Sequence, residues 1–164
     1  MKRTGLFTII LFLTAIIYSS CKEDVYVDWK LLNDKWYATF EDSMKLKDSL
    51  GNYVFQKTSS GIYYKVIKQG NQRHPNLSDP IYVNYRGSLV DGSVFDSTKT
   101  ILYLSSTVKG WQEMVPKMQD GGNYTIYIPS KLGYDTATIR AAIPPYSVLR
   151  FDIHLINSGD FIHN

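Results

Sequence analysis

The sequence of 164 residues has one cysteine and three histidines, and it lacks the short motifs that mark most catalytic sites. A single cysteine cannot form a disulfide within the chain. His74, His154 and His163 have no metal-like spacing and no second cysteine beside them, so no metal site is predicted. The sequence has no Gly-rich phosphate loop and no G-x-S-x-G elbow, which argues against phosphoryl transfer and serine hydrolysis.

The first 20 residues have the layout of a secretory signal peptide. Lys2 and Arg3 precede an apolar run over residues 6–18, and two serines follow it. Thr8 and Thr14 interrupt a run that is already shorter than the roughly 20 apolar residues needed to cross a bilayer. We therefore favour a cleaved signal over a permanent membrane anchor.

Without this segment the chain has 16 basic and 15 acidic side chains, because the segment contains only two charged residues, Lys2 and Arg3. The 144 residues that remain suit a single hydrophobic core. They contain no run of Lys and Arg that could neutralise a string of phosphates, so no nucleic-acid partner is predicted.

Residues 28–51 are predicted to form an N-terminal helix. The large apolar side chains of this segment recur at steps of three and four, which is the spacing of one helical stripe; they are Trp29, Leu32, Trp36, Phe40 and Met44. Asp28 is the expected N-cap, and Gly51 is expected to end the helix. The stripe fits packing on its own domain, which we favour, or a contact between two copies.

Beyond Gly51 the pattern changes to alternation, which is typical of strands with one buried face. Four runs show it: IYYKVIK, IYVNYRG, NYTIYIP and VLRFDIHLI. Between the second and third runs, residues 108–118 fit a short helix ended by Gly121 and Gly122, with Pro116 as a cause of shortening or kinking. We predict an α+β domain over residues 52–164, in which a curled antiparallel sheet wraps around one short helix.

Five aromatic residues lie on five different elements of this predicted domain: Tyr85, Phe95, Trp111, Tyr134 and Phe151. If the sheet curls around the helix, their side chains can converge on one pocket. A closed aromatic core is the plainer interpretation, and composition alone favours it.

The order of the motifs then indicates a family. The runs VNYRGSLVDGSVFDST, VKGWQEMVPKM, NYTIYIPSKLGYD and AAIPPYSVLRFDIHLI resemble FKBP-type peptidyl-prolyl isomerases, above all exported bacterial members of the macrophage-infectivity-potentiator kind. SSGIYYKVIKQG resembles their first strand, so that the likeness covers about residues 58–157. The resemblance implies a half-barrel of antiparallel strands around one helix, and no cofactor.

Carried over by position, the resemblance implies a site for a proline ring. Trp111 would be its floor and Val108 would offer a backbone N–H to one substrate carbonyl. The Tyr134 hydroxyl would hold another carbonyl, and Asp96 would lie at the rim near Tyr85. The remaining implied wall and edge residues are Phe95, Leu102, Ile139, Ile143 and Phe151.

Several positions depart from the family pattern. Thr100 and Leu102 stand near positions that are usually aromatic, and Asp135 stands where glycine is usual. Lys99 is the only counterpart of a basic residue that often follows the Phe-Asp pair. We therefore expect a thinner pocket edge, a Tyr134 loop that can shift, and weaker support of Asp96.

The segment before Cys21 resembles the lipobox of bacterial lipoproteins, although Tyr18 replaces the usual leucine. The resemblance implies lipid attachment at Cys21, a tether over residues 21–27, and export to the cell envelope at the outer membrane, facing the periplasm or the surface. Covalent lipid anchors a soluble domain because each buried methylene contributes about 0.8 kcal/mol.

The leading hypothesis is an exported, lipid-anchored prolyl isomerase that assists the folding of envelope or surface proteins. Its partners would be proline-containing polypeptides, the macrolide ligands of the family and the membrane, with the protein as a monomer or weak dimer. One rival is a binding or chaperone module with little turnover, or an accessory subunit of a surface lipoprotein complex. The other is a structural lipoprotein with a closed aromatic core.

Overall fold

The computed structural model describes residues 25–71, 73–137 and 142–159. Its centre is a six-stranded sheet in the order β1-β2-β5-β6-β3-β4, in which every neighbouring pair is antiparallel. The strands are β1 (Gln56–Lys57), β2 (Tyr63–Lys68), β3 (Pro80–Ser88), β4 (Val94–Tyr103), β5 (Asn123–Ile128) and β6 (Leu149–Ser158).

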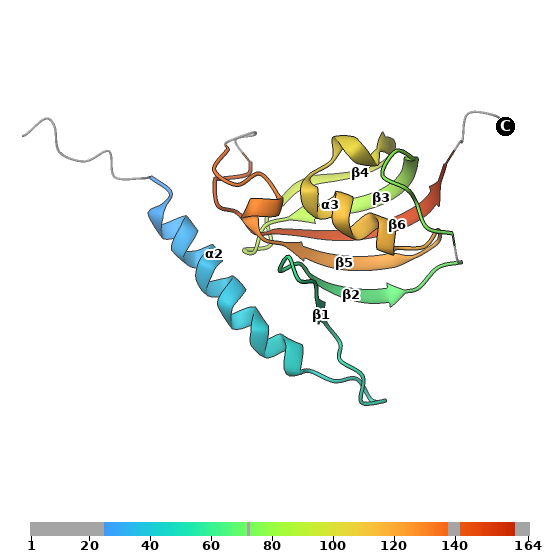
Figure 1. Ribbon diagram of the computed structural model, residues 1–164. Helices are drawn as coiled ribbons and strands as arrows, with labels where there is room; N and C mark the ends of the chain where they lie inside the picture. The colour runs from blue at the N-terminus through green and yellow to red at the C-terminus, as the bar shows by residue number, and fades with distance from the viewer. Residues whose placement is uncertain (1–24, 72, 138–141, 160–164) are drawn as a thin grey trace, which may run out of the picture.

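One short helix, α3 (Lys109–Met114), lies against one face of this sheet (Figure 1). Pro116 limits its length, since the chain tightens into a 3₁₀ turn over Val115–Lys117 in which a missing backbone donor costs little. Other 3₁₀ turns occupy Glu41–Lys45, Leu104–Ser106 and Ser130–Leu132. The prediction of a curled antiparallel sheet around one short helix is confirmed.

The core lies between α3 and the sheet. Alternate residues of the inner strands face it, including Val83 of β3, Ile126 of β5 and Leu155 of β6, while Met114 and Val115 enter from the helix side. All five are fully buried. The alternation read from the sequence thus identifies the core face of the sheet.

Two strands of the structure do not show this alternation. β1 has only two residues, and β4 forms an edge of the sheet with most of its side chains exposed. In β4 the apolar side chains of Ile101 and Tyr103 are exposed, so apolar and polar residues do not mark its two faces. Neither strand appears among the four predicted runs.

The N-terminal helix α2 spans Val27–Phe40, so the predicted range 28–51 is wrong at its C-terminal end. Asp28 is not the N-cap, because the first helical hydrogen bond runs from Lys30 N to the carbonyl of Tyr26. The Asp28 carboxylate instead lies in the first turn, where the helix dipole favours a negative charge. The signal peptide 1–20 and most of the tether lie outside the described residues.

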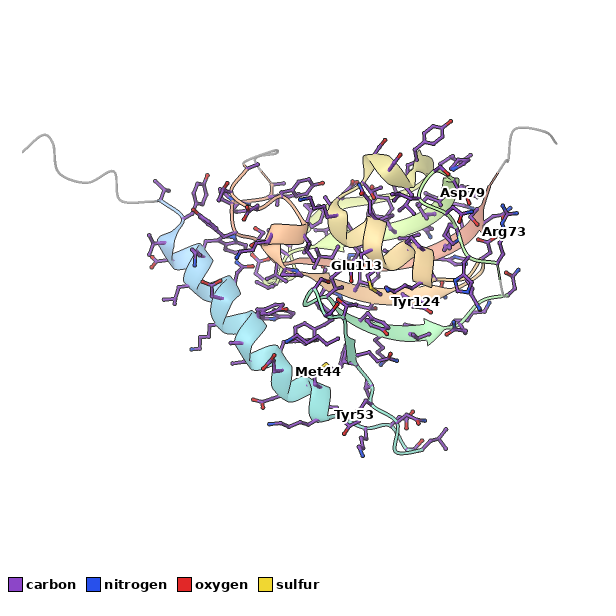
Figure 2. The ribbon with its side chains drawn as sticks, in the orientation of Figure 1. Met44, Tyr53, Arg73, Asp79, Glu113 and Tyr124 are labelled. Carbon is purple, nitrogen blue, oxygen red and sulfur yellow. The ribbon has the colours of Figure 1, made fainter. Side chains whose placement is uncertain are left out.

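After Phe40 the chain tightens into the 3₁₀ turn Glu41–Lys45, and a turn built around Asp48 follows. Asp48 Oδ1 accepts hydrogen bonds from Leu50 N and Asn52 N, each at 2.9 Å. Gly51 adopts a φ of 84°, which glycine allows without strain, and so serves this turn and not a helix cap. Met44 and Tyr53 line an open groove at this end of the molecule (Figure 2).

The inner face of α2 differs from the predicted stripe by one position. Leu32 is 47% exposed, whereas Asn33 is buried with 1% exposed. The helix packs on the outer face of the sheet, where Trp36 and Phe40 contact the ring of Tyr127 at centroid distances of 5.3 and 4.6 Å. The structure thus shows the stripe packing on its own domain.

Tyr63 of β2 is fully buried by this helix although it lies on the face opposite the core. The Phe40 and Tyr63 ring centroids are 5.0 Å apart. Glu41, just beyond α2, accepts hydrogen bonds from Lys57 and from the Tyr63 hydroxyl. These hydrogen bonds hold the pKa of the Glu41 carboxyl below its usual value.

Replacement of Phe40 by alanine tests the docking of α2. We expect Phe40→Ala to lower the free energy of unfolding by about 2 kcal/mol, because half-buried aromatic contacts with Tyr63 and Tyr127 are lost. Leu32→Ala, on the exposed face of the same helix, is the matched control and should change it by no more than about 0.5 kcal/mol. Urea unfolding measures both, and equal losses would contradict this packing.

Candidate active site

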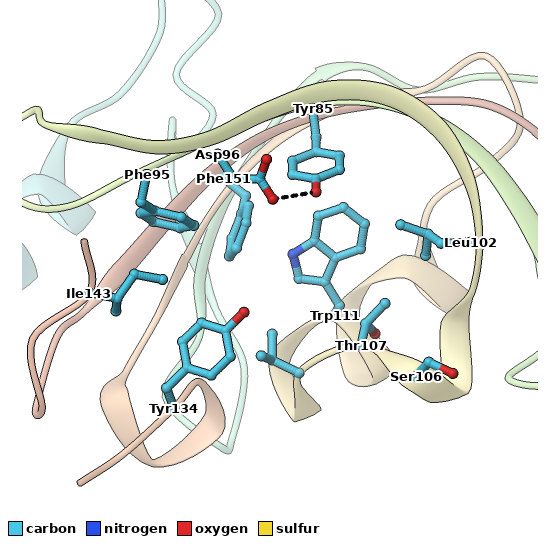
Figure 3. A pocket seen from close by; sticks show the side chains of 11 residues that line it. Tyr85, Phe95, Asp96, Leu102, Ser106, Thr107, Trp111, Tyr134, Ile143 and Phe151 are labelled. Carbon is cyan, nitrogen blue, oxygen red and sulfur yellow. Dashed lines mark hydrogen bonds between the residues drawn. The ribbon is translucent and has the colours of Figure 1, made fainter. Parts of the chain in front are cut away.

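The pocket opens on the core face of the sheet and is built from five parts of the fold. β3 supplies Tyr85, β4 supplies Phe95, Asp96 and Leu102, and β6 supplies Phe151. The remaining lining residues are Ser106, Thr107, Val108 and Trp111 around the start of α3, and Tyr134 and Ile143 between β5 and β6. Figure 3 shows these lining side chains. The cavity volume is about 350 Å³.

Four aromatic rings form the floor and one side of this pocket. Trp111, only 3% exposed, meets Phe151 at a centroid distance of 5.2 Å and Tyr85 at 5.1 Å, in both cases nearly edge to face. Phe95 meets Phe151 edge to face at 5.5 Å. This geometry is the favourable one for aromatic pairs, so the rings hold one another in place.

A β-bulge explains how Phe95 and Asp96 both reach the pocket although neighbouring side chains of a strand normally point to opposite faces. Gly87 pairs with Asp96, but Ser88 pairs with Val94, so Phe95 is the extra residue on β4. A bulge of this kind re-aims a side chain. Gly87 also leaves the space that the Phe95 ring occupies, since a Cβ there would lie 2.5 Å from Phe95 Cε2.

Among the residues that the structure describes, Asp96 is the only carboxylate that lines the pocket. Its Oδ2 accepts a hydrogen bond of 2.7 Å from the Tyr85 hydroxyl (Figure 3). Lys99, the residue expected to support Asp96, lies elsewhere: its Nζ is 5.2 Å from the centre of the Tyr82 ring. The Tyr85 hydroxyl therefore supplies the observed polar support of Asp96.

The start of α3 supplies polar groups to the opposite side of the pocket. Val108 is the N-cap, and its carbonyl accepts hydrogen bonds from Trp111 N and Gln112 N. The Thr107 hydroxyl donates to Leu104 O at 2.7 Å and so holds the turn before the helix. Within the described part of the chain, the buried Trp111 Nε1–H has no hydrogen-bond acceptor.

The Tyr134 loop keeps its place because Asp135 adopts a left-handed backbone conformation. The φ of Asp135 is 51°, a region that Asp enters more readily than most residues. Its N–H donates to Ser130 O at 2.9 Å and its carbonyl accepts from Tyr146 N at 2.7 Å. The Tyr134 hydroxyl points into the pocket (Figure 3), so the departure from glycine at position 135 does not remove it.

The structure brings together nine of the ten residues that the resemblance implied for the site. Ile139 lies outside the described residues. Thr100 is not part of the lining, and Leu102 alone represents its stretch of β4. Ser106 and Thr107 were missed, although their position directly before Val108 was a usable signal.

Metal ligands are not part of the arrangement: within residues 25–71, 73–137 and 142–159, no three His, Cys, Asp or Glu side chains gather as a metal site would require. The same ranges contain no helix long and apolar enough to span a bilayer.

Residues 71–156, more than half of the chain, match the model of a family described as FKBP-type peptidyl-prolyl cis-trans isomerase. The chain belongs to the FKBP family. Solved structures that superpose on this chain include two proteins of the same kind. FkpA of Escherichia coli superposes with a TM-score of 0.73 at 26% identity, covering 97% of this chain and 74% of that chain. A peptidyl-prolyl isomerase of Pseudomonas syringae gives a TM-score of 0.67 at 26% identity, covering 77% and 92%.

Curated FKBP relatives are more similar in sequence. A probable FkpA of Neisseria meningitidis is 38% identical over 119 residues, which cover 70% of this chain and 44% of the relative. Mip of Coxiella burnetii is 36% identical over 104 residues, which cover 60% and 45%. The chain thus spans less than half the length of these relatives.

Replacement of Gly87 by alanine tests the fit of the two phenylalanines. The added methyl group would lie 2.5 and 2.6 Å from Phe95 ring atoms and 3.0 Å from Phe151 Cε1, so at least one ring must move. We expect the affinity for a macrolide of the kind FKBP proteins bind to fall at least about tenfold, and stability to fall by about 1–3 kcal/mol.

Ser97→Ala, on the exposed part of β4, is the control for Gly87→Ala and should leave both quantities close to those of the wild type. Tryptophan fluorescence titration measures the binding. Unchanged affinity in a folded Gly87→Ala protein would show that the Phe95 ring does not shape the pocket.

Proposed function

We propose that this protein is a peptidyl-prolyl cis-trans isomerase that assists the folding of exported or surface proteins. The observation that carries the proposal is the pocket itself, in which five aromatic rings and one hydrogen-bonded carboxylate line about 350 Å³ of space. Family membership supports the same activity.

The physics of the reaction fits such a pocket. Rotation about an X–Pro bond breaks amide resonance, so the twisted transition state is less polar than either planar form, and uncatalysed exchange takes tens to hundreds of seconds. A dry aromatic site that binds the twisted form best lowers the barrier without proton transfer or a covalent step. Removal of about 4 kcal/mol from the barrier would accelerate exchange about a thousandfold.

Eight of the eleven lining residues have a role in this proposal. The proline ring would rest on Trp111, beside the wall that Phe95 and Phe151 form together and close to the side chain of Ile143. The Val108 N–H and the Tyr134 hydroxyl would each hold a substrate carbonyl. Asp96, fixed by Tyr85, would face the carbonyl carbon of the bond that turns, where its negative charge favours the twisted amide.

The same proposal places the protein at the cell envelope, anchored by lipid on Cys21. The signal-like segment, the lipobox-like residues and the relationship to an outer membrane protein MIP of Legionella longbeachae support it. Proline-containing polypeptides and macrolides are the proposed ligands, and the docked helix α2 favours a monomer or a weak dimer.

A second candidate is a binding or chaperone module with little turnover. Leu102 favours it, because this edge of the pocket has an aliphatic side chain where an aromatic one is usual in the family. Suppression of aggregation of an unfolded client, independent of its prolines, would support this alternative.

A prolyl-exchange assay on residues 22–164 with a short X–Pro peptide tests the proposed activity. We expect clear acceleration by the wild type and a loss of at least about a hundredfold in kcat/KM for the variant with both Phe95→Ala and Asp96→Ala, because one wall and the only carboxylate of the pocket disappear.

Circular dichroism of the double variant checks that its fold persists. If a well-folded wild type does not accelerate prolyl exchange but binds a macrolide, the result contradicts the proposed isomerase activity and supports the second candidate, a binding module.

Lipid attachment has its own test. We expect the full chain to partition into the membrane fraction of a bacterial host and to incorporate radiolabelled palmitate, and Cys21→Ser to abolish both. Ser20→Ala, which keeps the thiol, is the control. Membrane association of Cys21→Ser equal to that of the wild type would indicate an uncleaved helix as the anchor.

A further inference from the structure

The first turns of α2 hold the end of the loop that joins β5 to β6. Trp29 Nε1 donates a hydrogen bond to Ser147 Oγ at 3.0 Å, and Asn33 Oδ1 accepts one from Val148 N at 2.8 Å. These residues are more than 110 positions apart in sequence, and the start of α2 lies beside this loop in the fold (Figure 1). The helix therefore fixes the backbone directly before β6.

Asn33 is the least expected member of this contact. It is 1% exposed, and it occupies the inner face of the helix beside the apolar stripe. A buried amide is unfavourable unless its groups are paired, and here Nδ2 also donates to Trp29 O at 2.9 Å. A leucine would pack at this position but could not hold the N–H of Val148.

One line of contacts leads from α2 to Tyr134. Lys30 Nζ lies 5.8 Å from the centre of the Tyr146 ring, next to Ser147 in the chain. Tyr146 has a φ of 64°, an unusual conformation for a bulky residue, and its N–H donates to the carbonyl of Asp135 at 2.7 Å. Asp135 is the direct neighbour of Tyr134 in the pocket wall.

A second line leads to Ile143. The Ser147 hydroxyl that accepts the Trp29 N–H also donates to the carbonyl of Pro144 at 2.6 Å. Ser147 is 3% exposed and Ile143 is 2% exposed, so neither can move without disturbing its packing. Pro144 follows Ile143 directly, which places this wall residue one peptide unit from the helix-held hydroxyl.

We propose that Asn33 and Trp29 are positioning residues for the pocket, and that α2 sets the wall formed by Tyr134 and Ile143. The inference rests on the proposed isomerase function and deepens it, because it makes the N-terminal helix part of the substrate-binding apparatus. The floor is also held by contacts within the sheet and α3, since Trp111 packs against Tyr85 and Phe151.

The first test compares Asn33→Ala with Tyr37→Phe in the full chain, solubilised in mild detergent. The Tyr37 hydroxyl donates to Gly61 O before β2, so Tyr37→Phe removes a hydrogen bond of the same helix away from the loop. We expect hydrogen exchange of the Asp135 and Tyr146 amides to rise at least about tenfold in Asn33→Ala and to change less than about twofold in Tyr37→Phe. This readout needs no substrate.

The second test is a double-mutant cycle on kcat/KM with Tyr134→Phe. We expect Asn33→Ala alone to lower kcat/KM about tenfold, because a small displacement of a binding group has effects of this size. If Asn33 acts through Tyr134, the double variant loses less than the product of the two single losses. Trp29→Phe, which keeps an aromatic side chain but loses the indole N–H together with part of the ring system, provides the same cycle if Asn33→Ala is poorly folded.

Unchanged amide exchange, or strictly multiplicative losses in the cycle, would overturn the proposal. If the wild type shows no isomerase activity, the cycle is measured on macrolide affinity. Coupling there together with increased exchange would support the positioning role while the proposed reaction fails, so the two failures remain distinguishable.

Discussion

The packing of Trp111 against the sheet is the interaction on which the domain depends. α3 has six residues, too few to be stable in isolation, so it persists only because its buried side chains bind it to the strands. The Trp111 ring meets Tyr85 of β3 and Phe151 of β6, which ties the helix to two adjacent strands at once. The same ring is the floor of the pocket, so stability and ligand binding rest on one side chain.

The central strands, the short helix and most of the pocket could be predicted from the sequence, since alternation and motif order report directly on a buried face. The edge strand β4 could not, because the apolar side chains of Ile101 and Tyr103 are exposed while the polar Thr100 is half-buried, so residue type does not report the inward side of this strand. The bulge at Phe95 was equally hidden: it is a matter of pairing between β3 and β4, and pairing register leaves no local mark on either strand.

The N-terminal helix shows a different limit of sequence interpretation. The apolar spacing indicated a helix and placed Leu32 on its inner face, whereas the polar Asn33 was not part of the stripe. Asn33 is nevertheless buried, because its amide oxygen accepts a hydrogen bond from Val148 N. Beyond Phe40 the chain tightens into a 3₁₀ turn, and the Asp48 side chain then binds the backbone N–H groups of Leu50 and Asn52, which offers this segment an alternative to helical bonding. Such polar contacts are specific to one pair of atoms and follow no period.

The sheet is covered on both faces, by α3 on one and by the rings of α2 on part of the other, and the three tryptophans of the chain are distributed over these layers. Trp111 lies in the pocket. Trp36 of α2 contacts Tyr127 of the sheet, and Trp29 lies where α2 meets the loop before β6. Each layer thus carries its own intrinsic fluorophore. Single-tryptophan versions of this protein could follow pocket occupancy, helix docking and loop position as three separate optical signals.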